Sequence, residues 1–167
     1  VRNSVFFGNA STAYATALSL YGAQTIYFTN NTVSGNLAGE PGISEAAAHF
    51  GTPSSGNIYL NNNIFHANTG SGQSDLHADL TDTLVANDIQ TMTGTPSPFS
   101  SGNVSVDPRF IGGGNLRLQE NSPLIDFGNN SALGGVGTVD IAGYPRINGI
   151  IDLGAYELFP LLSDGFE

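Results

Sequence analysis

The chain has 167 residues, no cysteine and no lysine, and its four arginines face 14 carboxylates, so its formal net charge is −10. A negative field of this size repels nucleic acids and anionic membrane surfaces. The length suits one domain with one core, and no apolar run approaches the roughly 20 residues that a transmembrane helix needs.

The first predicted element is a motif that recurs along the first half of the chain. It consists of Asn, a small polar residue, Val or Ile, and then Gly or Ala followed by Asn. It occurs at 2–9 (RNSVFFGN), 30–36 (NNTVSGN) and 61–68 (NNNIFHAN), with a looser copy at 87–89. The period is about 28 residues, within the range of stacked repeats. We therefore expect three apolar side chains to lie in register, one above the next, in a wall of parallel strands: Val5, Val33 and Ile64.

Short strands are predicted directly before two of these motifs. The runs at 26–29 (IYFT) and 58–61 (IYLN) alternate between aliphatic or aromatic residues and tyrosine or polar residues. Alternation with a period of two is typical of a strand with one buried face. One face then carries Ile26, Phe28, Ile58 and Leu60, and the opposite face carries Tyr27 and Tyr59.

The three consecutive asparagines at 61–63 predict a corner. The chain must bend there, and asparagine tolerates the left-handed backbone conformation better than other non-glycine residues. Asparagines stacked from one coil to the next can also form a hydrogen-bonded ladder. We predict that the structural ladder runs through Asn3, Asn31 and Asn62, and that Asn61 and Asn63 point to solvent. The alternative is a polar hairpin loop.

The one predicted helix is short. It covers 42–50 (GISEAAAHF), where Ser44 could cap a run of alanines in the loop between the second and third coils.

From about residue 95 the sequence becomes rich in Gly, Pro and Asn. A stack of coils needs a closing end that covers its open strand edges. Asn148-Gly149, between Arg146-Ile147 and Ile150-Ile151, predicts a tight type I′ hairpin folded over the last coil.

The predicted fold class is all-β: a right-handed parallel β-helix, or solenoid, with a Gly/Pro-rich C-terminal cap and hairpin. We divide the chain into β-helix coils (1–94), final coils and cap of the same domain (95–157), and a C-terminal tail (158–167). Because the first motif begins at once, we also read residue 1 as a cut or processed end. Its open coil could then support self-association.

Four segments in the second half resemble a known family. They are VDPRF, NLRLQENSPLIDFGNN, VDIAGYPRINGIIDLGAYE and, less tightly, SDLHADLTDTLVANDIQ. They are similar to the C-terminal part of the bacterial choice-of-anchor Q domain proteins, a group of secreted β-helix proteins, over roughly 58–157. The resemblance implies an extracellular or outer cell surface location. Family members carry a second acidic residue where this chain has Ala142, and the LLSDGFE ending resembles the tails of exported proteins.

Two groups of side chains are weak metal candidates. Asp75, His77 and Asp79 alternate along one strand face, and carboxylates and imidazoles are metal ligands. A cap group of acids lies in Gly-rich turns: Asp126, Asp140, Asp152 and Glu157. No cofactor is expected, with calcium in the cap as the alternative. The competing interpretations are a half-buried strand for the first group and acids that bind turn amides for the second. Arg146 is expected to pair with one of the cap acids.

No catalytic residues are predicted. The sequence has no nucleophile elbow, and it shows no carboxylate pair or basic groove of the kind that polysaccharide hydrolases and lyases use. We therefore expect a structural or binding module of a larger surface or secreted protein, with a glycan or a surface protein as its partner. The candidate binding face consists of Tyr21, Tyr27 and Tyr59. The alternative is a carbohydrate-active lyase or hydrolase whose catalytic coils lie partly upstream.

Overall fold

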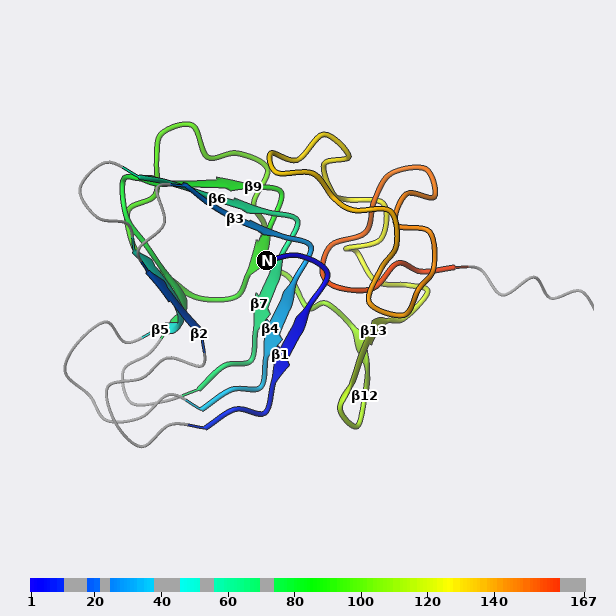
Figure 1. Cartoon of the computed structure of the whole chain (residues 1–167). Helices are drawn as coiled ribbons and strands as arrows, with labels where there is room; N and C mark the ends of the chain where they lie inside the picture. The colour runs from blue at the N-terminus through cyan, green and yellow to red at the C-terminus, as the bar shows by residue number, and fades with distance from the viewer. Residues whose placement is uncertain (11–17, 22–24, 38–45, 52–55, 70–73, 160–167) are drawn as a thin grey trace, which may run out of the picture.

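A computed structural model of the chain describes residues 1–10, 18–21, 25–37, 46–51, 56–69 and 74–159 (Figure 1). These residues form an all-β structure without a helix. The strands are β1 (Val5–Phe7), β2 (Leu18–Tyr21), β3 (Thr25–Thr29), β4 (Thr32–Ser34), β5 (Ala46–Gly51), β6 (Asn57–Asn61), β7 (Ile64–His66), β8 (Ser74–Ala78), β9 (Asp82–Val85), β10 (Asp88–Ile89), β11 (Met92–Gly94), β12 (Phe110–Gly112) and β13 (Asn115–Leu118).

Three parallel sheets form the first two thirds of the molecule. The first sheet has the strand order β1-β4-β7-β10, the second β2-β5-β8-β11 and the third β3-β6-β9. Successive strands therefore enter different sheets, and each circuit of the chain adds one strand to each sheet. Figure 1 shows the sheets as sides around a common interior. Strands β1, β2 and β3 lie at one end of their sheets, and self-association through this end stays a prediction.

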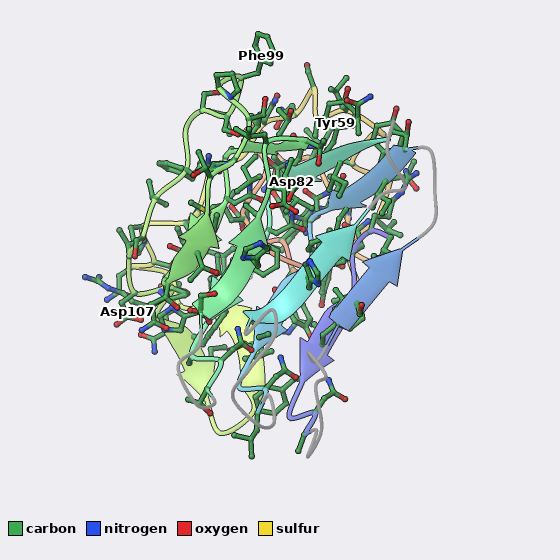
Figure 2. All side chains as sticks on the ribbon, turned by 90° about the vertical axis from the view of Figure 1, so that its left-hand side faces the viewer. Tyr59, Asp82, Phe99 and Asp107 are labelled. Atoms are coloured by element: carbon green, nitrogen blue, oxygen red, sulfur yellow. The ribbon has the colours of Figure 1, made fainter. Side chains whose placement is uncertain are left out.

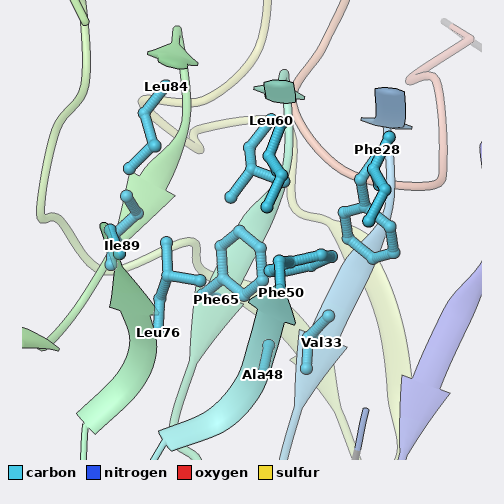
Figure 3. Close-up of a cluster of buried hydrophobic side chains, with 12 residues drawn as sticks. Phe28, Val33, Ala48, Phe50, Leu60, Phe65, Leu76, Leu84 and Ile89 are labelled. Carbon is cyan, nitrogen blue, oxygen red and sulfur yellow. The ribbon is translucent and has the colours of Figure 1, made fainter. Parts of the chain in front are cut away.

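Apolar side chains from all three sheets fill this interior (Figure 3). In the third sheet, Ile26 pairs with Ile58 and Phe28 with Leu60, and all four are buried as predicted, whereas Tyr27 and Tyr59 face outward. The central members of the cluster are at most 1% exposed: Phe28, Val33, Ala48, Phe50, Leu60, Phe65, Leu76 and Leu84.

The predicted register of the first sheet was wrong by one residue at one position. Val5 pairs with Thr32, and Thr32 pairs with Ile64, so Val33 is not in their row. Val33 lies instead between Phe6 and Phe65 and faces the interior. The strands are parallel, as expected. The motif misled because both faces of this sheet are buried, so apolar residues occur on the outer face as well.

The outer face of the first sheet is covered by residues 122–159, which we call the strap (Figure 1). Leu124 and Leu153 of the strap pack with Ile64, and the amide of Ala155 donates to the Thr32 hydroxyl over 3.0 Å. Gly154 has a φ of +86°, and a Cβ there would lie 2.7 Å from Ile64 Cδ1, so this position requires glycine. Of the segment expected to close the end of the stack, residues 97–104 do pair with β9 and β10, whereas the strap lies along the side of the stack.

Two predicted local elements are corrected. The helix expected at 42–50 is strand β5 from Ala46 onward, and 42–45 lie outside the described residues. Because β5 has hydrogen-bonded neighbours on both sides, pairing prevails over the helix propensity of alanine.

The hairpin around Asn148-Gly149 is absent. A type I′ turn requires a positive φ at both central residues, but only Gly149 has one, and no strand forms on either side of the turn. The antiparallel pair of the second half is β12–β13 instead.

Candidate functional site

The corner asparagines form two rows with different partners. Asn3, Asn30 and Asn62 adopt positive φ angles of 48°, 54° and 57°, so asparagine does occupy the left-handed corner. Each asparagine that directly follows a left-handed corner residue belongs to an amide ladder. Asn31 Nδ2 donates to Asn63 Oδ1 over 3.1 Å, and Asn63 Nδ2 donates to Asn87 Oδ1 over 2.9 Å. The ladder consists of Asn31, Asn63, Asn87 and Asn103.

The predicted ladder was therefore right at Asn31, one residue early at Asn62, and wrong at Asn3, where the next residue, Ser4, only donates its backbone amide to Asn31. Asn62 and Asn3 point to the strap: Asn62 Nδ2 donates to the Asn129 carbonyl, and Asn3 Nδ2 donates to the Val139 carbonyl. Asn61 and Asn63 are 2% and 0% exposed, so neither points to solvent as predicted. A left-handed residue turns its side chain out of the stack, which leaves the following residue to bond within it.

The outer face of the third sheet carries a pair of stacked tyrosines. Tyr27 and Tyr59 are register partners, and their ring centroids lie 5.4 Å apart with an angle of 13° between the ring planes. Tyr27 is 42% exposed. Tyr21 does not join them, because it belongs to β2 of the second sheet and its side chain lies outside the described residues. The candidate face therefore reduces to two rings on adjacent strands.

A cavity of about 380 Å³ adjoins Tyr27 at the β1–β3 end of the stack. Its lining combines the apolar side chain of Ile26 with Arg2 and with Gly134 of the strap. The strap passes so close that a Cβ on Gly134 would lie 2.6 Å from Tyr27 Cγ. An aromatic ring, a cation and apolar surface thus line one concavity.

The structure separates the three predicted metal ligands of β8. Asp75 is 1% exposed and accepts hydrogen bonds from the amide and side chain of Asn68 and from the amide and hydroxyl of Thr91. It ends a second row of side-chain amides that runs through Asn9, Asn36 and Asn68. The alternating pattern predicted Asp75 on the open strand face. In the structure Asp75 lies near the start of β8, where the row through Asn9, Asn36 and Asn68 meets the strand.

His77 and Asp79 stay on the outer face of the second sheet, where His77 Nε2 lies 3.5 Å from Asp79 Oδ1. His49, which sequence analysis did not select, joins them as the register partner of His77. Within the described ranges, the three side chains each offer a ligand atom within 4.8 Å of the others. The missed signal was a second alternating run, Ala48-His49-Phe50, one circuit before Leu76-His77-Ala78.

The acids of the strap bind backbone amides. Asp140 accepts from the amides of Ala142, Tyr144 and Glu157, and Asp152 accepts from those of Asp126 and Leu158. This is the pattern of acids that hold turns. Whether calcium binds there stays a prediction.

Arg146 lies at the centre of this cluster with no exposed surface. Its Nη2 donates to the carbonyls of Asp152 and Gly154 over 2.7 Å each, and its Nε lies 3.8 Å from Glu157 Oε2. Burial, followed by the nearby Asp152 carboxylate, raises the pKa of Glu157 to about 7. The predicted pairing of Arg146 with a cap acid is confirmed. This arginine is therefore structural.

The other arginines of the second half are also engaged. Arg117 lies over the Tyr156 ring at 4.7 Å, and Arg109 donates to the Asn121 carbonyl. A deep exposed cleft lined by Asp75, Asp79 and an arginine would support the alternative of a carbohydrate-active enzyme. The described residues do not assemble that set, because Asp75 is enclosed in the amide row.

Among the described residues there is no helix long and apolar enough to cross a membrane. Comparisons with models of protein families, with curated proteins and with solved structures found no match for this chain.

Proposed function

We propose that the chain is a right-handed parallel β-helix of the choice-of-anchor Q group, exported from a bacterium and acting as a rigid binding module. The rotation of the chain through three parallel sheets and the coil-to-coil amide ladder support the solenoid. The two segments most specific for the resemblance, SPLID and DLGAYE, lie side by side in the strap, where the Leu153 amide donates to the Leu124 carbonyl.

The single observation that carries a binding role is the stacked pair Tyr27–Tyr59 beside the cavity. The two rings stack on each other, so the pair offers a ligand its ring edges and the outer face of Tyr59. The apolar face of a neutral sugar fits an aromatic ring of this kind, and Thr83 lies beside it as the next register partner of Tyr59. The net charge of −10 disfavours an acidic polymer. Neutral glycans are therefore the proposed ligand class.

The test is affinity electrophoresis of the purified chain through gels that contain neutral polysaccharides. We expect retardation by an affinity that falls about 5-fold in Tyr59→Ala, because an aromatic contact contributes about 1 kcal/mol. Tyr59→Phe keeps the ring and should retain most of the binding, which separates stacking from the loss of a hydroxyl bond.

Tyr144→Ala is the control for exposed tyrosine area, since this ring lies in the strap against Phe159. Equal retardation of the wild-type chain and Tyr59→Ala, or no retardation by any neutral polysaccharide, would remove the glycan proposal. The remaining proposal would then be that the module binds a surface protein.

A further inference from the structure

The outer face of the second sheet gathers two imidazoles and a carboxylate that the proposed glycan face does not use. His49 of β5 and His77 of β8 are register partners on adjacent parallel strands, so their side chains leave the sheet on the same side. Asp79 follows His77 by two residues and returns to that side. Figure 2 views the molecule from the side of this sheet. The register of β5 with β8 and the alternation of side chains along the chain therefore bring these three donors together.

A chain of hydroxyl groups determines which nitrogen of His77 carries the proton. The Ser74 hydroxyl donates to the Leu76 carbonyl over 3.0 Å, so its oxygen must accept from the Thr93 hydroxyl, also at 3.0 Å. Thr93 Oγ1 must then accept from His77 Nδ1, at 3.0 Å. A proton therefore sits on Nδ1, which leaves Nε2 as the nitrogen that faces the Asp79 carboxylate.

Nε2 and the Asp79 oxygen lie 3.5 Å apart, so a cation bound to Nε2 of the neutral ring would also lie within reach of the carboxylate. The separation is close to the roughly 3.3 Å expected between two ligand atoms bound to one tetrahedral zinc ion. A partner that orients the second ring nitrogen is the usual companion of a metal-binding histidine, and Thr93 fills that position.

The other two donors are suited to the same ion. The His49 and His77 ring centroids lie 5.5 Å apart. A turn fixes the backbone of Asp79, because the Asp82 side chain accepts from its amide and the Asp82 amide donates to its carbonyl.

We propose that His49, His77 and Asp79 form a binding site for one divalent first-row transition ion of the Zn²⁺ class. Two imidazoles with one carboxylate favour zinc, nickel or copper over calcium and magnesium, which prefer oxygen ligands. Three protein ligands leave a coordination position for water or a ligand. The site lies on a different sheet from the tyrosine pair and does not depend on the proposed glycan binding.

The experiment uses the chain without an affinity tag and stripped with a chelator. Titration calorimetry with Zn²⁺ should show one saturable site, and Ca²⁺ should not compete. His49→Ala and His77→Ala should each weaken binding at least 10-fold, since even a residue that only orients a metal ligand contributes about 10-fold to 100-fold. Thr93→Val should weaken it by about 10-fold while Thr93→Ser retains it, which identifies Thr93 as a positioning residue.

His66 is the matched control. It is the third histidine of the chain and lies in β7 against Phe110, away from the second sheet, so His66→Ala should bind Zn²⁺ as the wild type does. Ring NMR signals of the wild-type chain give a readout independent of variant folding. Zn²⁺ should shift the signals of two histidines and leave those of His66 unchanged. The absence of saturable binding, or binding as tight as that of the wild type in His49→Ala and His77→Ala, would overturn the proposal.

Discussion

The parallel stack and the strap satisfy their backbone groups in opposite ways. In the stack, strands pair with strands, and each circuit repeats the bonds of the one before. The strap is described without a single strand from 122 to 159, apart from an isolated bridge between Val139 and Pro145. Its amides bond to individual side chains such as Asp140, Asp152 and Asn130. The stack is therefore stabilised by many equivalent hydrogen bonds, whereas the strap depends on a few particular residues.

The corner asparagines join the two regions. Because the left-handed residue points outward and its successor points inward, adjacent asparagines of the same type serve different parts of the molecule. Asn62 holds Asn129 of the strap from both ends of its amide group, while Asn63 holds Asn31 and Asn87 of neighbouring circuits. Variants at Arg146, Asn63, Asn62 and Asp88 would test how far this division extends.

The largest effect is expected from Arg146→Ala, which removes the centre of the strap. The change leaves Glu157, Asp152 and two carbonyl groups buried without their cationic partner, and breaking a buried pair of this kind costs about 3–5 kcal/mol. The free energy of unfolding, measured by urea denaturation, should fall by that amount.

Arg117→Ala is the control, because this arginine contributes chiefly a contact with the Tyr156 ring, worth about 0.5–1 kcal/mol. Similar losses for both variants would show that the strap does not depend on its buried arginine.

The second effect concerns the two asparagine rows. Asn63→Ala should lower the free energy of unfolding by about 2–3 kcal/mol, because it leaves buried groups of Asn31, Asn87 and Phe28 without partners. Asn62→Gly keeps the left-handed backbone and should mainly expose the strap amides around Asn129 to hydrogen exchange.

The exposed Asn57, also on β6, provides a control variant, Asn57→Ala, that should change little. If Asn62→Gly lowered the hydrogen-exchange protection of strap and stack amides equally, separate roles for the Asn62 row and the Asn63 row would be contradicted.

The smallest effect is a pH dependence inside the stack. Burial raises the pKa of Asp88 from its ordinary value of 3.8 to about 7, so the protonated form favours the folded state. The stabilisation is fully present below pH 3.8 and is lost as the pH rises through about 7. Asp88→Asn stays uncharged and should lack this loss.

The measurement is the difference in melting temperature between the wild type and Asp88→Asn from pH 4 to pH 8. Glu157, whose pKa is also about 7, titrates in both proteins and cancels. A difference that stays constant with pH would contradict the assignment to Asp88.

Several features of the stack could be predicted from the sequence because they are periodic. The alternation around Tyr27 and Tyr59 assigned both faces of the third sheet correctly, and the repeated asparagines located the corners. Register was harder. Thr32 and Ile64 lie under the strap, so the polar face that would have distinguished inside from outside is missing there.

The site residues divide in the same way. His77 and Asp79 could be chosen from alternation along one strand, but His49 belongs to another circuit and joins them only through pairing of β5 with β8. Asp75 has the same spacing and was wrongly included, since burial by Asn68 and Thr91 depends on where the second amide row meets the strand.

The sequence by itself determined that strands repeat, that runs of asparagine mark corners and that the interior is apolar, because these depend on neighbouring residues and a fixed period. Only the tertiary structure decided which asparagine of each pair faces the interior, where the strap lies and which ligands meet on the second sheet. Those outcomes depend on contacts between residues 24 to 136 positions apart, and no local pattern encodes them.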